Sequence, residues 1–265
     1  MVNVTVYHYP DGSMTGSVVR CSDLADTSQS LAPRLPSRYS QLATAEQQAE
    51  NEQRSRRRSI AQLKRHIRAH NLRRLLTFTN GASGQGWGGP SEALDTVMRW
   101  LRSTEGRAFF RGSPVVLIAE RGARGGRWHV HAAIKSGFWL PYAAIIASWS
   151  SHMERAGYHS QTGTHRFHAG DERGEHKGGF SSARWCARYM AKYVTKSLGL
   201  EMRAGVHRYR AINSPAPEAV RFRADTARLA LDTLGVRDRD CFAITVAAPD
   251  GTEHLIGYAW DSGGG

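Results

Sequence analysis

Trp128-His129-Val130-His131-Ala132-Ala133-Ile134 is the stretch that decides the fold of this 265-residue chain. Its alternation predicts a strand over 128–134 with both imidazoles on one face and the intervening apolar residues turned toward a core. His129 and His131 then lie about 6.6 Å apart along the backbone. Two imidazoles at this spacing can chelate one divalent ion and leave open positions for a phosphate oxygen and water. An exposed edge strand without ligands would show the same pattern.

The apolar run 115–120 predicts a neighbouring strand, because it is rich in β-branched residues. The short loop 121–126 joins the two strands, so we expect an antiparallel pair. Glu120 ends this strand and can supply a carboxylate ligand, although a solvated strand end would look alike. Two histidines and one carboxylate with open positions suit Mg²⁺ or Mn²⁺ better than a closed structural zinc site. Five more histidines match no ligand spacing and are expected on loop and groove surface: His152, His159, His165, His168 and His176.

Tyr189-Met190-Ala191-Lys192-Tyr193-Val194-Thr195-Lys196 lies in a predicted helix over 182–198. One stripe of this helix consists of Tyr189, Lys192, Tyr193 and Lys196. The opposite, apolar stripe should face the sheet, and it consists of Ala187, Met190, Ala191, Val194 and Leu198. A phenol with an ordinary pKa near 10 attacks a phosphodiester only if a metal ion and a nearby lysine stabilise the developing charge. Half-buried tyrosines whose lysine neighbours reach solvent are the alternative.

The remaining elements follow from local pattern and turn residues. We predict a strand at 75–79, a basic helix within 54–74, a helix over 91–103 capped by Ser91, and a helix over 142–156. Hairpins are predicted around Pro10-Asp11-Gly12-Ser13 and around Pro249-Asp250-Gly251. Residues 22–52 are polar and predicted to be a mobile arm. The order of elements indicates an α+β fold, with a central antiparallel sheet, helices packed on one of its faces, and peripheral hairpins.

The charge of the chain points to a polyanionic partner. Lys and Arg number 36 against 23 acidic residues, a net charge of +13, which is typical of nucleic-acid binding. A generally basic protein without chemistry would share this excess. Residues 54–74 hold nine of these cations and no acid, and the loop near 121–127 adds others. The DNA-binding candidates are Arg57, Arg58, Lys64, Arg65, Arg68, Arg121, Arg124 and Arg127.

Three classes are disfavoured by absent patterns. Three scattered cysteines, Cys21, Cys186 and Cys241, predict neither a disulfide framework nor a zinc ribbon, which favours a reducing cytoplasm. The sequence has no run of eighteen apolar residues, so it predicts no membrane span. The sequence also lacks the G-x-x-x-x-G-K-[ST] motif, so we expect no ATP-driven helicase within the chain.

The segment 75–79, the pair His129 and His131, and the paired Tyr-x-x-Lys units at 189–196 resemble, in this order, the three motifs of rolling-circle replication initiators. These belong to the HUH (His-hydrophobic-His) endonuclease superfamily, and the chain looks like its two-tyrosine phage and plasmid type. The resemblance covers roughly residues 55–200. It implies a nicking-joining endonuclease domain over 53–204. The predicted hairpins and polar arm make 1–52 an N-terminal hairpin and arm and 205–265 a C-terminal extension with a hairpin, and neither end carries a motif of the family. Relaxases place their tyrosine before the histidine motif, which argues against that branch.

The resemblance implies a central antiparallel sheet with the histidine pair on a middle strand and the tyrosine helix beside it. His129, His131 and Glu120 would bind Mg²⁺ or Mn²⁺. Tyr193 would occupy the position of the nucleophile in single-tyrosine relatives, and Tyr189 would be the second nucleophile. One tyrosine would attack single-stranded DNA at a replication origin, leaving a 5′-phosphotyrosine and a free 3′-OH. A host helicase and polymerase would then act, in the cytoplasm of a phage or plasmid host.

Three other functions remain open at this point. A transposase of the same superfamily would act on transposon ends. A metallohydrolase would cut without a covalent step and use Tyr189 and Tyr193 only for positioning. A non-catalytic single-strand binding protein would stack bases on Trp87, Trp128 and Trp185.

Overall fold

The computed structural model describes residues 1–20, 45–80, 86–122, 126–135, 141–158, 167–169, 180–196, 209–247 and 253–262. The chain divides into two compact units. The terminal unit comprises 1–48 and 217–265, and the central unit comprises 49–216. The two ends of the chain therefore fold together, whereas the sequence division into 1–52, 53–204 and 205–265 kept them apart. None of the described helices is long and apolar enough to cross a membrane.

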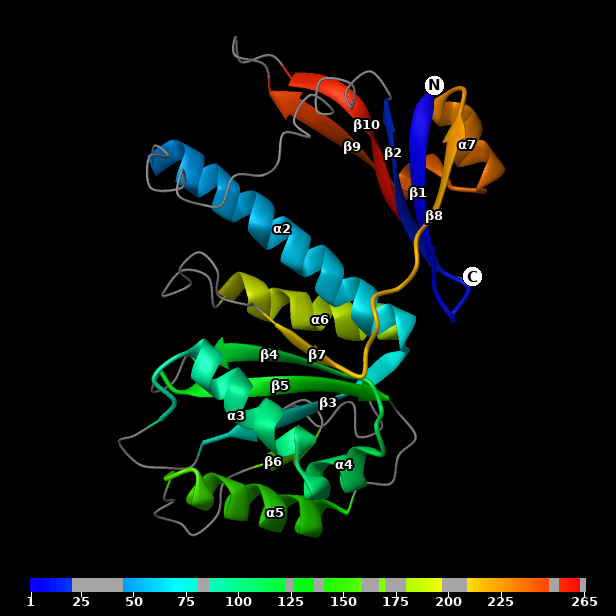
Figure 1. The fold of residues 1–265 in the computed structure, drawn as a ribbon. Coiled ribbons are helices and arrows are strands. Elements are labelled where there is room, and N and C mark those ends of the chain that lie inside the picture. The colour runs from blue at the N-terminus through cyan, green and yellow to red at the C-terminus, as the bar shows by residue number, and fades with distance from the viewer. Residues whose placement is uncertain are drawn as a thin grey trace, which may run out of the picture. The chain divides into compact units, whose positions relative to one another are not determined.

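The central unit is built on a five-stranded antiparallel sheet with the histidine strand in the middle (Figure 1). Its strand order is β6-β3-β5-β4-β7. The strands are β3 (Leu72–Thr79), β4 (Val115–Arg121), β5 (Trp128–Lys135), β6 (Phe167–Ala169) and β7 (Arg210–Ile212). The helices are α2 (Ala45–Ala69), α3 (Pro90–Arg102), α4 (Thr104–Phe110), α5 (Tyr142–Arg155) and α6 (Ala183–Lys196). The α+β class and the antiparallel pair β4–β5 are confirmed.

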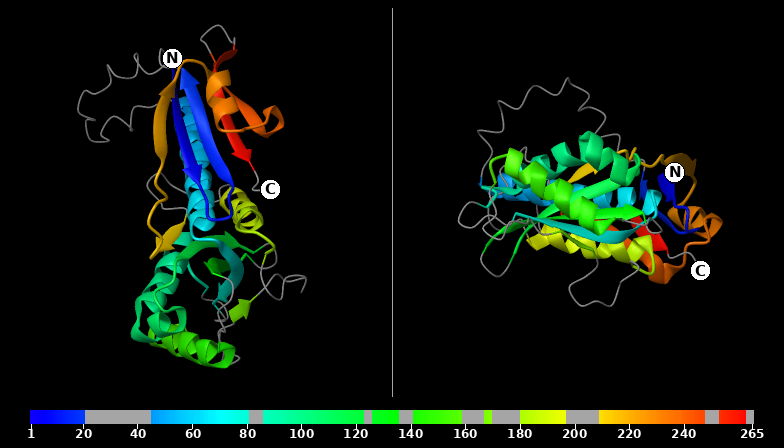
Figure 2. Two further views of the ribbon diagram at one scale, coloured as in Figure 1. Left: turned by 90° about the vertical axis from the view of Figure 1, so that its right-hand side faces the viewer. Right: turned by 90° about the horizontal axis from the view of Figure 1, so that it is seen from below.

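Helices cover both faces of this sheet, so the expectation of helices on one face was wrong. Leu63 and Ile67 of α2 pack with α6 against one face, and α3, α4 and α5 pack against the other. Figure 2 shows α6 and α5 on opposite sides of the strands. The run Val115–Ala119 of β4 is buried throughout. A strand covered on both faces requires a continuous apolar run of this kind. The run at 115–119 was therefore the sequence signal for helices on both faces of the sheet.

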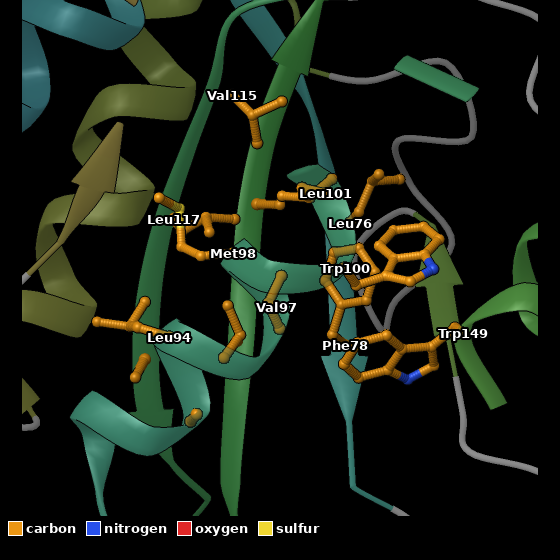
Figure 3. Close-up of a cluster of buried hydrophobic side chains, with 14 of the residues drawn as sticks. Leu76, Phe78, Leu94, Val97, Met98, Trp100, Leu101, Val115, Leu117 and Trp149 are labelled. Atoms are coloured by element: carbon orange, nitrogen blue, oxygen red, sulfur yellow. The ribbon is translucent and has the colours of Figure 1, made fainter. Parts of the chain in front are cut away.

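An aromatic cluster forms the core beneath α3 and α5 (Figure 3). The ring of Trp100 meets Phe78 edge-on at 5.5 Å and Trp149 at 5.7 Å between centroids. All three side chains are fully buried. Edge-to-face aromatic pairs add to the free energy of area burial, so this cluster fixes α3 and α5 on the sheet.

Helices α3 and α2 begin at residues other than those that the sequence predicted. Helix α3 begins at Pro90 with Gly89 as its N-cap, and no side chain caps it. Ser91 is therefore inside the helix, because proline at the first helical position already has the required φ and lacks the N–H that a cap would bind. Helix α2 begins at Ala45, so the predicted polar arm includes its first turns; residues 22–44 lie outside the described part.

The terminal unit is a second five-stranded antiparallel sheet, of order β8-β1-β2-β10-β9. Its elements are β1 (Val2–His8), β2 (Met14–Arg20), β8 (Val220–Ala224), α7 (Ala227–Thr233), the 3₁₀ helix η3 (Asp238–Asp240), β9 (Cys241–Ala247) and β10 (Glu253–Ser262). Both predicted hairpins, β1–β2 and β9–β10, are confirmed. The ladder between β2 and β10 joins them. Strand β2 has glycine at position 16 because a Cβ there would lie 2.3 Å from the indole of the buried Trp260.

A half-buried histidine makes the stability of the central unit depend on pH. The ring of His152 on α5 stacks on Trp149 at 5.9 Å. Burial, and then the charges of Arg155 and Arg99, hold the pKa of His152 below its ordinary value of 6.5. As the pH falls below about 6.5, His152 therefore becomes protonated in the unfolded chain while it remains neutral in the folded chain. The contribution of neutral His152 to stability is therefore fully present above pH 6.5 and is lost as the pH falls through the lowered pKa.

We expect the free energy of unfolding to fall between pH 7.5 and about 5.5, above the range in which ordinary carboxylates titrate. Urea unfolding followed by tryptophan fluorescence at both pH values measures this. His152→Gln, which removes the titrating group, should show a smaller decrease than the wild-type chain. An equal decrease in the two proteins would assign the pH dependence to other groups.

Candidate functional site

The strand register gathers polar side chains on the sheet face that α6 covers. His131 on β5 lies opposite Thr77 on β3, and His129 lies opposite Thr79. On the other side of β5, Glu120 of β4 lies opposite His129. Residues at these paired positions share a face of the sheet because side chains alternate along each strand. The middle strand thus has oxygen-bearing side chains beside its histidines on both neighbouring strands.

Both ring nitrogens of His131 have partners. Its Nε2 lies 2.9 Å from Oε2 of Glu120, and its Nδ1 lies 3.0 Å from Oγ1 of Thr77. His131 is buried, with 8% of its surface exposed. A carboxylate only accepts hydrogen bonds, so Nε2 must donate here, and in the neutral ring Nδ1 accepts from the Thr77 hydroxyl. The hydroxyl can also accept, so Thr77 fits the opposite tautomer, in which Nε2 is left to bind a metal.

The ring of His129 lies against the backbone of Gly122, just after β4. A Cβ at position 122 would lie 2.8 Å from Nε2 of His129 and 3.1 Å from Cδ2. The amide of Gly122 donates to the carbonyl of Arg127 at 2.8 Å, which closes the β4–β5 hairpin. The absence of a side chain at position 122 therefore lets the imidazole occupy its place. Sequence reasoning missed Gly122, which it treated as part of a loop.

We expect Gly122→Ala to displace the His129 ring while the fold is kept, because the atom that must move is in a side chain rather than in the backbone. Under the function proposed below, DNA cleavage should fall by about tenfold or more, which is the usual effect of disturbing the support of a metal ligand. Cleavage rate and melting temperature are the measurements. Gly112→Ala is unsuitable as a control because Gly112 has φ +69°; Gly86→Ala, where a Cβ meets nothing within 4 Å, is the matched control.

The two tyrosines of α6 lie directly over this group. The ring of Tyr193 stacks on the imidazole of His131, with centroids 4.2 Å apart and planes 11° apart. Tyr189 meets the Tyr193 ring edge-on at 5.2 Å and contacts Phe180 at 5.3 Å. Tyr193 is 7% exposed, whereas Tyr189 is half-buried. The aromatic pair therefore leads from the buried histidine to the rim of the site, and Phe180 is a neighbour that the sequence did not suggest.

The apolar face of α6 packs on the sheet as predicted, whereas Tyr193 of the polar stripe is also buried there. Ala187, Met190, Ala191 and Val194 are buried, as predicted, and Leu198 lies outside the described residues. Of the three stripe side chains that the structure describes, Lys192 is exposed, Tyr189 is half-buried and Tyr193 is buried. The backbone of Lys196 ends α6, and its side chain lies outside the described part. Burial raises the pKa of the Cys186 thiol on the same helix, which keeps it from competing as a nucleophile.

The metal site that the sequence predicts is brought together only in part. Within the described residues, no group of three or more His, Cys, Asp or Glu side chains lies close enough to hold a metal ion. Glu120 and His131 are the two predicted ligands that lie in contact, with facing atoms 2.9 Å apart, the distance of an ordinary hydrogen bond. Two adjacent ligands, each about 2.1 Å from an octahedral ion, lie about 3.0 Å apart, so the same spacing is compatible with a shared ion. His129 shares the face but rests on Gly122, so its role as a ligand stays a prediction.

The basic candidates fall into exposed and buried groups. Arg57 and Arg58 on α2 are exposed, and Lys64 and Arg65 are half-buried. Arg68 is 3% exposed, and this burial argues against the predicted phosphate contact. Arg121 and Arg127 are exposed on the β4–β5 hairpin, close to His129 in sequence, and Arg124 lies outside the described residues.

The remaining aromatic and histidine candidates differ in exposure and in their place in the fold. Trp87 and Trp128 are 4% and 5% exposed, which weakens the interpretation as a stacking protein without chemistry. Trp185 is exposed. His168 was expected on loop surface but belongs to β6, where it lies opposite Thr77. His159, His165 and His176 lie outside the described residues.

Comparisons with protein-family models, with curated proteins and with solved structures found no match.

Proposed function

We propose that this chain is a metal-assisted nicking-joining endonuclease that cuts single-stranded DNA through a covalent tyrosine intermediate. One observation carries the proposal: the phenol ring of Tyr193 lies flat on the imidazole of His131, which is itself paired with Glu120. A nucleophile, a metal-ligating imidazole and a carboxylate are the groups that such a reaction needs. The contacts among α6, β5 and β4 support the proposal, because they bring these three groups together.

The reaction is a transesterification. The hydroxyl of Tyr193 or Tyr189 loses its proton and its oxygen attacks the scissile phosphorus. The bond from phosphorus to the 3′ oxygen breaks, and that oxygen takes up a proton. The products are a 5′-phosphotyrosine and a free 3′-OH. One phosphoester replaces another, so a later attack by a 3′-OH on the phosphotyrosine can reseal a strand without ATP.

Residues of the chain would hold the ion and the DNA in this step. His131 and Glu120, with His129 as the predicted third ligand, would hold Mg²⁺ or Mn²⁺, which supplies charge stabilisation at the non-bridging phosphate oxygens. Thr77 orients the His131 ring through Nδ1. Lys192 is exposed beside Tyr189 on α6, where its charge favours an approaching phosphate.

The two tyrosines support a two-step role. Tyr193 contacts His131, and Tyr189 contacts Tyr193, so both rings belong to one cluster. A second tyrosine would cut the newly copied junction while the first still holds the DNA end. We infer from this and from the resemblance to two-tyrosine initiators that the substrate is a rolling-circle origin, with a host helicase and polymerase as partners in the cytoplasm of a phage or plasmid host.

The experiment that tests the function uses labelled circular single-stranded DNA carrying candidate origins. The protein is incubated with Mn²⁺ or with a chelator and separated on a denaturing gel. We expect a protein–DNA adduct only with the metal, and mass spectrometry of the digested adduct should find the nucleotide on the peptide containing Tyr189 or Tyr193.

A matched pair of variants tests the role of His131. His131→Gln keeps groups that can bond Glu120 and Thr77 but is a poor metal ligand, so adduct formation should fall by about 100-fold or more. His66→Gln changes a half-buried histidine on α2 that bonds Ser214, and it should act like the wild type. Cut DNA without an adduct would contradict the covalent step and favour a metallohydrolase. DNA binding without cleavage of any of the origins tested would contradict the proposed endonuclease activity.

A further inference from the structure

Trp185 on α6 stands apart from the other described tryptophans. Its side chain is 57% exposed, whereas Trp87, Trp100, Trp128, Trp149 and Trp260 are at most 5% exposed. The guanidinium carbon of Arg188 lies 5.6 Å from the centroid of its ring. A cation held near an exposed indole gives the surface both a flat apolar face and a positive charge.

The helix places this pair at the edge of the tyrosine cluster. Trp185 precedes Tyr189 by four residues and Tyr193 by eight, so it lies about 6 Å and about 12 Å from them along the helix axis. Residues four apart are neighbours on one helix face. Tyr193 is buried on His131, Tyr189 is half-buried, and Trp185 and Lys192 are exposed. The side chains therefore form a path from the buried site to solvent.

The chemistry of this edge fits one ligand. A nucleobase stacks on an indole whatever its identity, and guanidinium and ammonium groups attract the phosphates on either side. Arg188 and Lys192 are both exposed on α6, and the chain carries a net charge of +13. A protein partner would be expected to require a broader apolar patch than one indole between two cations.

We propose that Trp185, with Arg188 and Lys192, is a stacking platform for a base of the single-stranded DNA within a few nucleotides of the scissile phosphate. This inference rests on the proposed function, because it takes Tyr189 and Tyr193 as the cutting groups. The platform holds the strand so that its backbone passes over Tyr189. It gives affinity without sequence preference, since every base has a flat face.

The test measures binding of fluorescently labelled single-stranded oligonucleotides by anisotropy, in chelator so that no cleavage occurs. Trp185→Ala should weaken binding by roughly 5- to 100-fold, and Trp185→Phe should restore most of it. The matched control is Phe242→Ala, which removes another exposed aromatic, 63% exposed on β9 of the terminal unit; it should bind like the wild type. Melting temperatures should match in all four proteins because both positions are exposed.

A scan with single abasic sites locates the stacked base. At one position near the cut, loss of the base should weaken binding to the wild type but not to Trp185→Ala. Wild-type binding by Trp185→Ala, or a change only in its oligomeric state, would overturn the platform. These results are separate from the adduct test. Binding that depends on Trp185, without any metal-dependent adduct, would overturn the proposed nuclease function. Metal-dependent adducts, with Trp185→Ala binding DNA as tightly as the wild type, would overturn only the stacking platform.

Discussion

Replacing both tyrosines of α6 by phenylalanine, Tyr189→Phe with Tyr193→Phe, is expected to abolish the protein–DNA adduct. The loss should be on the order of 10³-fold or more, as it is when other covalent enzymes lose their nucleophile. Phenylalanine keeps each ring, so the stack on His131 and the edge contact between the rings are preserved. The measurement is the rate of adduct formation with Mn²⁺ on a cognate origin.

The single variants distinguish the two positions. Each should still form adducts through the remaining tyrosine. We expect Tyr193→Phe to lose more activity, because its ring contacts His131, the proposed metal ligand, whereas Tyr189 contacts Tyr193 and Phe180. Tyr209→Phe is the matched control: Tyr209 is half-buried in the same unit and packs near His66 on α2. Adducts that persist in the double variant would show that neither tyrosine is the nucleophile.

Trp100→Ala is expected to have the largest effect on stability, lowering the free energy of unfolding by about 3–5 kcal/mol. Trp100 is fully buried, and its ring contacts Phe78, Trp149 and Phe110 at 5.5, 5.7 and 6.0 Å. Its Nε1 donates to Oγ of Ser148 at 3.1 Å. The substitution leaves a cavity and removes this hydrogen bond, a large loss for a domain of ordinary stability of about 5–15 kcal/mol.

Trp185→Ala is the control for this experiment, since it makes the same chemical change at a position that is 57% exposed. Its effect on unfolding should stay within about 0.5 kcal/mol. Urea titrations followed by circular dichroism measure both proteins. Equal losses in the two variants would mean that the aromatic cluster does not hold α3 and α5 on the sheet.

Many elements follow from the sequence because their signals are local. The alternation around His129 and His131 predicted the histidine strand, and the run 115–120 predicted its antiparallel partner. The apolar stripe of α6 is buried as predicted, but the burial of Tyr193 from the polar stripe was not predicted. Period and turn residues act between neighbours along the chain, so a single sequence carries them. The short strands β6 and β7 have three residues each and give no such signal.

The sequence by itself determined the α+β class, the shared face of the histidines and the tyrosine stripe opposite an apolar one. Only the tertiary structure decided that the two terminal hairpins pair through β2 and β10, that helices cover both faces of the central sheet, and that Tyr193 rests on His131. Local preferences leave open which strand edges meet across two hundred residues. The burial of apolar area and the satisfaction of backbone hydrogen bonds over the whole chain make that choice.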